Sequence, residues 1–354
     1  CAVGSGADYL VIAHEQFSTD DLQRLVTQRQ SEGYSSAIVP VGGLYAKYSS
    51  GIPDPKAIRA CVRDAAAKRG TAAVLLVGAS SYDPTNKLKL GAVDFLPTFY
   101  AKTDEFVTFA PTDALIADID EDGTQDLSIG RFPVRTGAEL ANVVNQTLAY
   151  DVIVYGQKAI FAADRNDTAQ RYNFKADSEA IIDGFPPGWS VAQAYIDDLG
   201  LVGARELLIP AINGGVGLTA YIGHSYESAW SFEGLFDTTD ADNLTNSGRP
   251  TVVAQMGCWN TYFVSPSADT LAHRLLLGGD RGAAAVLGAS ALTEASHEAD
   301  IAKRLLGANL MNGSTTIGEA LLQAKQDLAA ENPEWFDVLY GWQLMGDPLL
   351  RLAP

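Results

Sequence analysis

The strongest constraint on the fold is an alternation of short apolar runs with longer amphipathic segments. The pattern predicts a strand at residues 9–13, a helix at 20–32 and a strand at 36–41, and a similar series opens with a strand at 158–163. Such alternation is typical of α/β proteins with mainly parallel sheets. We therefore predict an α/β fold with two adjacent subdomains, residues 1–150 and 151–354, whose sheets are flanked by helices.

The remaining elements are assigned from the same periodicities. Further strands are expected at residues 72–77, 115–117, 127–129, 190–195, 218–222, 251–256 and 283–287. Further helices are expected at residues 55–69, 137–150, 177–184, 199–213, 269–277, 299–309 and 317–330.

Composition excludes several classes of protein. The 354 residues are 47% hydrophobic, which is enough for a large core, and 43 acidic against 25 basic residues give a net charge of -18. Nucleic acids and anionic membranes require clustered Lys and Arg, so neither is an expected partner. No apolar stretch approaches the ~20 residues of a membrane span.

The three cysteines are Cys1, Cys61 and Cys258. They are too few and too far apart for a disulfide framework or a zinc site, which leaves one free for chemistry. A chain that opens at Cys1 and continues with small residues suits a mature lipoprotein start or, equally, a processing boundary. Gly-x-Ser-x-Gly and His-x-x-x-His spacings are absent from the sequence, so serine-hydrolase and zincin chemistry are not supported.

Two of the predicted strands end beside a reactive side chain. The strand at 218–222 is followed by Gly223 and His224, and the strand at 251–256 is followed by Gly257 and Cys258. Neighbouring strands place their carboxyl ends about 4.8 Å apart, so the histidine could supply the base and the positive field that a thiolate needs. We expect the glycines to make room for a substrate backbone. The alternative is a buried core cysteine and a hydrogen-bonded histidine without chemistry.

A family resemblance rests on Ile212-Asn-Gly-Gly-Val-Gly-Leu-Thr-Ala-Tyr-Ile-Gly-His224, on the strand that ends in Cys258, and on residues 75–78, 128–133, 227–230 and 345–349. In matching order over nearly the whole chain, these segments resemble the catalytic domain of the gingipains, secreted bacterial cysteine endopeptidases. The resemblance implies a caspase-like fold, a peptide or protein substrate, a secreted or cell-surface location and no cofactor for the chemistry.

The resemblance also implies roles for individual residues. Cys258 corresponds to the nucleophile and His224 to the general base and acid, while the backbone N–H groups of Ser225 and Cys258 correspond to the oxyanion hole. This chain has Ser225 where the family usually has glycine. Asp164 is the candidate for the acid that orients the histidine, with Asp167 within the error of the alignment.

Three residues are assigned to substrate binding. Asp177 is the nearest match to the acid that holds a basic P1 side chain, although Asp177-Ser-Glu equally resembles a helix N-cap, the interpretation that we favour. Trp230 follows the histidine motif, and Glu294 lies where the family's tryptophan lid is replaced. If Asp177 corresponds to the family's acid, the resemblance implies a preference for a basic P1 side chain.

An acidic loop carries Asp118, Asp120, Asp122 and Asp126, with Gly123 between them. This spacing wraps oxygen ligands around calcium in an EF-hand, but Ile129 stands where the hand has its glutamate. Because gingipain-like proteins bind calcium, the loop is a candidate structural calcium site, with a solvated acidic turn as the alternative.

The leading functional hypothesis is a cysteine endopeptidase that hydrolyses peptide bonds through a Cys-His dyad and a thioester acyl-enzyme. One alternative is sortase-like processing or transpeptidation of surface proteins, in which an amine replaces water in the second step. The other is a catalytically silent interaction module.

Overall fold

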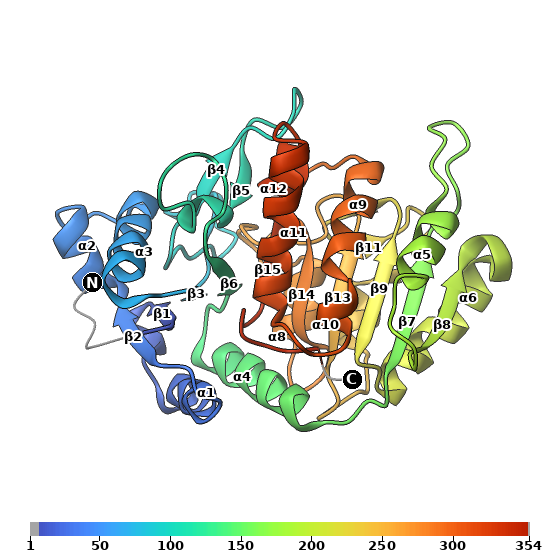
Figure 1. Ribbon diagram of the computed structural model, residues 1–354, viewed down its shortest axis with the longest axis horizontal. Coiled ribbons are helices and arrows are strands. Elements are labelled where there is room, and N and C mark those ends of the chain that lie inside the picture. The colour runs from blue at the N-terminus through green and yellow to red at the C-terminus, as the bar shows by residue number, and fades with distance from the viewer. Residues whose placement is uncertain (1–6, 353–354) are drawn as a thin grey trace.

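Ten strands of the computed structural model, which describes residues 7–352, form one broad sheet that crosses the middle of the molecule (Figure 1). The strand order is β2-β1-β3-β6-β15-β14-β13-β9-β7-β8. Their bounds are β1 Tyr9–Ala13, β2 Ser36–Pro40, β3 Ala73–Val77, β6 Ser128–Phe132, β7 Lys158–Ala163, β8 Ser190–Tyr195, β9 Leu218–Ile222, β13 Thr251–Met256, β14 Ala283–Ala289 and β15 Trp342–Met345.

The sheet consists of two parallel blocks that run in opposite directions. Strands β2, β1, β3, β6 and β15 are parallel to one another, and so are β14, β13, β9, β7 and β8. The blocks meet where β15 pairs antiparallel with β14. This mainly parallel sheet with flanking helices confirms the predicted α/β class. The division into two subdomains at residues 150 and 151 stays a prediction. The sheet is continuous across this division, since β15, from the C-terminal part of the chain, pairs with β6.

Helices cover both faces of the sheet, and the apolar side chains beneath them form the core. One face is covered by α1 Asp20–Ser31, α4 Gly137–Val152, α6 Ile196–Gly214, α7 Thr238–Asp242 and α8 Leu271–Leu277. The other is covered by α2 Val41–Tyr48, α3 Pro55–Arg69, α5 Phe174–Ile182, α9 Ala295–Leu305, α10 Ala308–Met311, α11 Ile317–Glu331 and α12 Phe336–Leu339. Strands β9 and β13 are buried along their whole length, which explains why most of their side chains are apolar.

Shorter elements lie outside the main sheet. A hairpin joins β4 Phe99–Ala101 to β5 Ala110–Thr112, and a small antiparallel sheet contains β10 Ser225–Tyr226, β11 Ala229–Trp230 and β12 Phe236–Asp237. Two 3₁₀ helices span Glu15–Phe17 and Ala114–Ile116. No helix within residues 7–352 is long and apolar enough to cross a membrane.

Most predicted elements are confirmed, several with identical bounds, including the strands at 158–163, 218–222 and 251–256. The strand predicted at 115–117 is wrong. That segment is the 3₁₀ helix Ala114–Ile116, in which the Ile116 N–H donates to the Asp113 carbonyl at 2.9 Å. The helix predicted at 177–184 begins earlier, at Phe174, because the Asn173 side chain accepts the Ala176 N–H and caps it. Strand β15 was not predicted.

Candidate active site

His224 and Cys258 follow the carboxyl ends of two adjacent parallel strands at the same position in the register. Strands β9 and β13 are parallel neighbours, and Ile222 pairs with Met256 as the last residue of each strand. The Gly223 N–H donates to the Met256 carbonyl at 3.0 Å, which continues the pairing one residue beyond the strands. Because His224 and Cys258 each follow two residues after this pair, the register brings them to one edge of the sheet.

The glycines before His224 and Cys258 make room for protein neighbours. Gly223 has a φ of 151°, and a Cβ there would lie 2.2 Å from the Cβ of Asp164. A Cβ on Gly257 would lie 2.3 Å from the Ser225 hydroxyl oxygen and 2.6 Å from the Gly223 carbonyl oxygen. The two glycines therefore let the strand ends pack against each other, and their role in the approach of a substrate backbone stays a prediction.

Ser225, the residue that departs from the family pattern, ties the two strand ends together. Its hydroxyl donates to the Cys258 carbonyl at 2.8 Å and accepts from the Asn260 amide at 3.3 Å. The turn after the cysteine is tight, because Trp259 adopts a φ of 63°, a conformation that is costly for a bulky side chain. Both oxyanion-hole candidates therefore belong to loops that are hydrogen-bonded to each other.

Cys258 is a free, half-buried cysteine, whereas Cys61 is disulfide-bonded. Within residues 7–352, the only hydrogen-bond contacts of its sulfur are with the carbonyl and the hydroxyl of Thr293, each at 3.6 Å. Burial raises the pKa of the Cys258 thiol, and Glu298, when it is ionised, raises it further. Within the described residues, no hydrogen bond joins the Cys258 sulfur directly to His224.

The ring of His224 is held by a carboxylate and by aromatic side chains. Its Nε2 lies 3.0 Å from an Oδ of Asp167. The Phe232 ring stacks on it at 5.1 Å between centroids, and the Phe174 ring meets it edge-on at 5.3 Å. With Nε2 occupied, Nδ1 is the nitrogen left for proton transfer.

The two candidate acids occupy different positions around His224. Asp164, 4% exposed, accepts hydrogen bonds from the Ser231 hydroxyl at 2.7 Å and from the His224 backbone N–H at 3.2 Å. Burial raises the pKa of Asp164. The ring itself meets Asp167, whose pKa is lowered by the Gln170 N–H and by His224. Asp164 thus contacts the backbone of the histidine, and Asp167 its imidazole.

Trp230 does not reach the surface. It is fully buried, it stacks on Tyr221 at 4.9 Å, and its indole N–H donates to Gln255 at 2.7 Å. The expectation that it contacts substrate is wrong, because a side chain with no exposed surface cannot touch a ligand from solution. Instead, it supports β9 and β13 from the core.

Asp177 of α5 lines a hollow, and Glu294 directly precedes α9, the helix that lines the same hollow. The capping interpretation of Asp177 is wrong, because Asn173 caps α5 and Asp177 follows within its first turn. Burial raises the pKa of this half-buried carboxyl, and Lys303 opposes that effect. Glu294 precedes α9 and accepts a hydrogen bond from the Tyr172 hydroxyl at 2.8 Å.

Two hollows adjoin these residues. One of about 260 Å³ is lined by Asp164, Asp167, His224 and Phe232, among others. One of about 420 Å³ is lined by Tyr172, Asp177, Lys303 and Trp335, among others. A larger hollow of about 650 Å³ lies elsewhere, around Arg29 and Arg351.

Several side chains around the site were missed from the sequence. Phe232 and Tyr172 lie in loops, where no periodicity marks an exposed aromatic ring beside a histidine. Glu298 could have been found from the sequence pattern. It occupies an apolar position on the buried face of α9, together with Ile301, Ala302 and Leu305.

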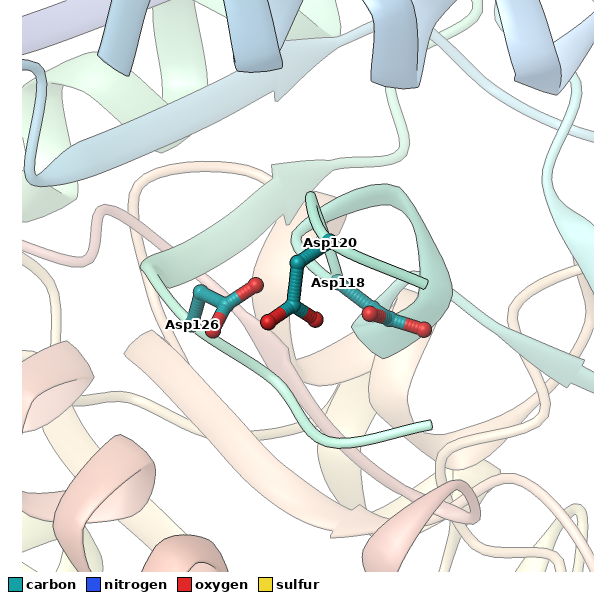
Figure 2. Close-up of side chains that lie close together, drawn as sticks. All are labelled: Asp118, Asp120 and Asp126. Atoms are coloured by element: carbon teal, nitrogen blue, oxygen red, sulfur yellow. The ribbon is translucent and has the colours of Figure 1, made fainter. Parts of the chain in front are cut away.

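The acidic loop is folded on itself (Figure 2). Carboxylate oxygens of Asp118, Asp120 and Asp126 lie within 4.8 Å of one another, whereas Asp122 is not part of this group. Asp118 accepts from the Glu121 and Gly123 N–H groups at 2.9 and 3.2 Å. Three carboxylates fit the oxygen ligands of calcium, yet the same hydrogen bonds suit a solvated turn, so the calcium site stays a prediction.

A mainly parallel α/β sheet that brings a free cysteine and a histidine to adjacent strand ends is an arrangement of cysteine peptidases. The sequence matches the model of peptidase family C25 over residues 3–353. The chain therefore belongs to peptidase family C25, and it is a gingipain-like cysteine endopeptidase. No curated protein sequence matches it.

Solved structures share the fold at low sequence identity. The Arg-specific cysteine proteinase gingipain R has a TM-score of 0.78 and 19% identity, over 98% of this chain and 78% of that one. The complex of Porphyromonas gingivalis RgpB pro- and mature domains gives 0.77 and 20%, over 99% and 81%. Dimeric latent PorU from Porphyromonas gingivalis gives 0.54 and 17%, over 99% and 30%.

Proposed function

We propose that this endopeptidase cleaves peptide bonds through Cys258 as nucleophile and His224 as general base and acid. The observation that carries the proposal is the register of β9 and β13, which delivers a free cysteine and a histidine to the same edge of the sheet. Family membership supports the reaction class, and a cysteine with a nearby base is the usual means of such catalysis.

In the first step, the peptide carbonyl occupies the space beside Cys258, and His224 takes the thiol proton as the sulfur attacks the carbonyl carbon. The backbone N–H groups of Ser225 and Cys258 donate to the oxyanion of the tetrahedral intermediate. The Asp167 carboxylate at Nε2 holds the ring in place, and His224 then gives the proton to the leaving amine. The product of this step is a thioester between Cys258 and the acyl half of the peptide.

In the second step, water attacks the thioester carbonyl, His224 accepts a proton from that water, and the thiol leaves with a proton. Apart from water, these steps balance with groups of the protein and the peptide, so the proposed reaction uses no cofactor. An added amine in place of water would give transpeptidation. Product analysis in the presence of an excess of glycine amide distinguishes hydrolysis from transpeptidation, since only transpeptidation joins the acyl half of the peptide to the glycine amide.

For substrate choice, we propose that Asp177 contacts a basic P1 side chain in the 420 Å³ hollow. Its half-buried carboxylate and the adjacent Tyr172 support this placement, while Lys303 in the same wall competes for the carboxylate. Equal cleavage of matched peptides with Arg and with neutral residues at P1 would remove the proposal.

We also propose a secreted or cell-surface location in a bacterium. The resemblance to the gingipains supports it, and the lipoprotein start at Cys1 lies outside the described residues. Recovery of the native protein in the cytoplasmic fraction would contradict this location.

The test of the dyad compares the parent with Cys258→Ala and Cys258→Ser on a peptide library, together with iodoacetamide labelling mapped by mass spectrometry. We expect labelling at Cys258 and loss of cleavage by at least about a thousandfold in Cys258→Ala. A Cys258→Ala variant as active as the parent would contradict the proposal. A folded parent that neither cleaves peptides nor reacts with an acyloxymethyl-ketone probe would favour the silent interaction module.

A further inference from the structure

Glu298 is a buried carboxyl that the proposed reaction does not use. It lies in α9 and is 3% exposed, although Glu is almost never fully buried without a charged partner. Within residues 7–352, no Lys, Arg or His forms an ion pair with it. A group of this kind is costly to bury, so its surroundings indicate what it does.

Three hydrogen-bond donors surround this carboxyl, and two of them belong to the neighbourhood of the cysteine. The Trp342 indole N–H donates to it at 3.3 Å. The Thr293 hydroxyl and the Gly257 N–H are its other donors. Gly257 directly precedes Cys258, and the Thr293 hydroxyl also lies 3.6 Å from the Cys258 sulfur. Thr293 therefore stands between the carboxyl and the thiol.

Burial raises the pKa of Glu298 to about 8, and the charge of Asp337 contributes to the rise. Burial therefore favours the protonated form of this carboxyl. It can then act as a hydrogen-bond donor as well as an acceptor.

The Thr293 hydroxyl has a single proton, so it can donate to only one of its two acidic neighbours at a time. We propose that Glu298 is a positioning residue for Cys258: in its protonated form it donates to the Thr293 oxygen, which directs the Thr293 hydroxyl proton toward the Cys258 thiolate. This inference rests on the proposed role of Cys258 as the nucleophile.

Loss of the Glu298 proton reverses the arrangement. Thr293 then donates to the carboxylate, so the sulfur loses a donor and gains a negative neighbour. Ionisation of either acid therefore opposes ionisation of the other.

Other charged groups near this pair belong to the elements that pack around α9. Asp337 of α12 lies close enough to raise the pKa of Glu298 and is hydrogen-bonded to His297 at 3.0 Å. The charge of Glu298 also contributes to the raised pKa of Tyr221 in β9. Lys325 of α11 donates to the Trp342 carbonyl at 2.7 Å, while on the α5 side Asp177 faces Lys303.

The test measures the rate of Cys258 alkylation by iodoacetamide as a function of pH, on the full chain, with the modified peptide quantified by mass spectrometry. In Glu298→Gln, the amide keeps a donor toward Thr293 and removes the negative charge. We expect the midpoint of alkylation to shift to lower pH by about one unit or more, and a two-step profile to become a single step. A purely structural role would lower the folded fraction without moving the midpoint.

Thr293→Val is the second variant, because it keeps the shape of the side chain and removes the hydroxyl. The midpoint is expected to move to higher pH, and the effect of Glu298→Gln is expected to shrink in the Val background. An unchanged midpoint in either folded variant, or an upward shift in Glu298→Gln, would overturn the inference. Since alkylation does not require peptide cleavage, a wild-type protein that is alkylated but cleaves no peptide would contradict the proposed function alone.

Discussion

At the scale of single residues, the orientation of His224 depends on which acid touches which part of it. Asp167 contacts the imidazole, and Asp164 contacts the backbone N–H of the same residue. Sequence alignment could not separate them, because both follow β7 within a few positions. Only the path of the loop after that strand assigns each carboxylate its partner.

Asp167→Asn tests this assignment. The amide lacks the charge of the carboxylate and holds the His224 ring less firmly at Nε2, so kcat/KM for peptides is expected to fall on the order of tenfold to a hundredfold. Stability should change little, since Asp167 is partly exposed. Steady-state kinetics and thermal unfolding measure both quantities.

The matched variant is Asp164→Asn, with opposite expectations. Its carboxylate accepts three hydrogen bonds in a buried position, from Arg165, His224 and Ser231, so the melting temperature should fall. If Asp164→Asn lost activity at full stability while Asp167→Asn stayed active, the two roles would have to be exchanged.

Phe232 gives a second prediction at this scale. Its ring is 71% exposed and stacks on His224, so it offers an apolar surface beside the reacting groups. Phe232→Ala is expected to raise KM several-fold with little change in the melting temperature. Phe106→Ala is the control, because Phe106 is 79% exposed between β4 and β5 and should affect neither quantity. Equal kinetics for Phe232→Ala and the parent would contradict the prediction.

At the scale of secondary-structure elements, α8 carries a histidine that is adapted to remain neutral. His273 is 4% exposed, and its Nδ1 lies 2.7 Å from the Thr270 hydroxyl that also caps the helix. Burial lowers the pKa of His273 to about 4. Its unfolded pKa is about 6.5, so between these two values only the unfolded chain binds the proton.

The stability of the protein should therefore fall as the pH drops from 6.5 toward 4. The contribution of this one group approaches about 3 kcal/mol at the lower limit. Urea unfolding of the parent and of His273→Gln at pH 7 and pH 5 measures the difference. The parent is expected to lose more free energy of unfolding than the variant over this interval, and equal losses would contradict the prediction.

The acidic loop also belongs to this scale. If Asp118, Asp120 and Asp126 bind calcium, calorimetric titration should show heat, and the melting temperature should rise with calcium. Neither effect would be expected of a solvated acidic turn.

At the scale of the whole molecule, buried ion pairs connect segments that are far apart in the sequence. Arg29 of α1 contacts Asp347, just after β15, at 2.7 Å and Asp151 of α4 at 2.9 Å. Asp347 is fully buried and also accepts from the Tyr9 hydroxyl at 2.9 Å. These contacts connect the N-terminal strand block to the segment that follows β15.

Removal of the Asp347 carboxylate leaves the Arg29 charge buried without its closest partner. Asp347→Ala is expected to lower the free energy of unfolding by about 3 to 5 kcal/mol, as measured by urea denaturation. The exposed pair between Arg304 and Glu331 is the control, and Glu331→Gln should have little effect. A similar small effect at Asp347 would contradict a structural role for the network.

The sequence by itself determined most strands of the main sheet, most helices and the choice of His224 and Cys258 as the candidate dyad. Apolar runs such as residues 218–222 and 251–256 are buried on both faces of the sheet, so their bounds follow from local hydrophobicity. His224 and Cys258 could be predicted because each follows such a run directly.

Only the tertiary structure decided what surrounds those residues. Loops and helices remote in sequence bring Asp167, Phe232, Thr293 and Glu298 to the site, and they place Trp230 in the core. The antiparallel pairing of β15 with β14 joins two parallel blocks, and no local pattern encodes it. The physical reason is that strand and helix periods depend on neighbours along the chain, whereas contacts between loops depend on how the completed sheet is packed.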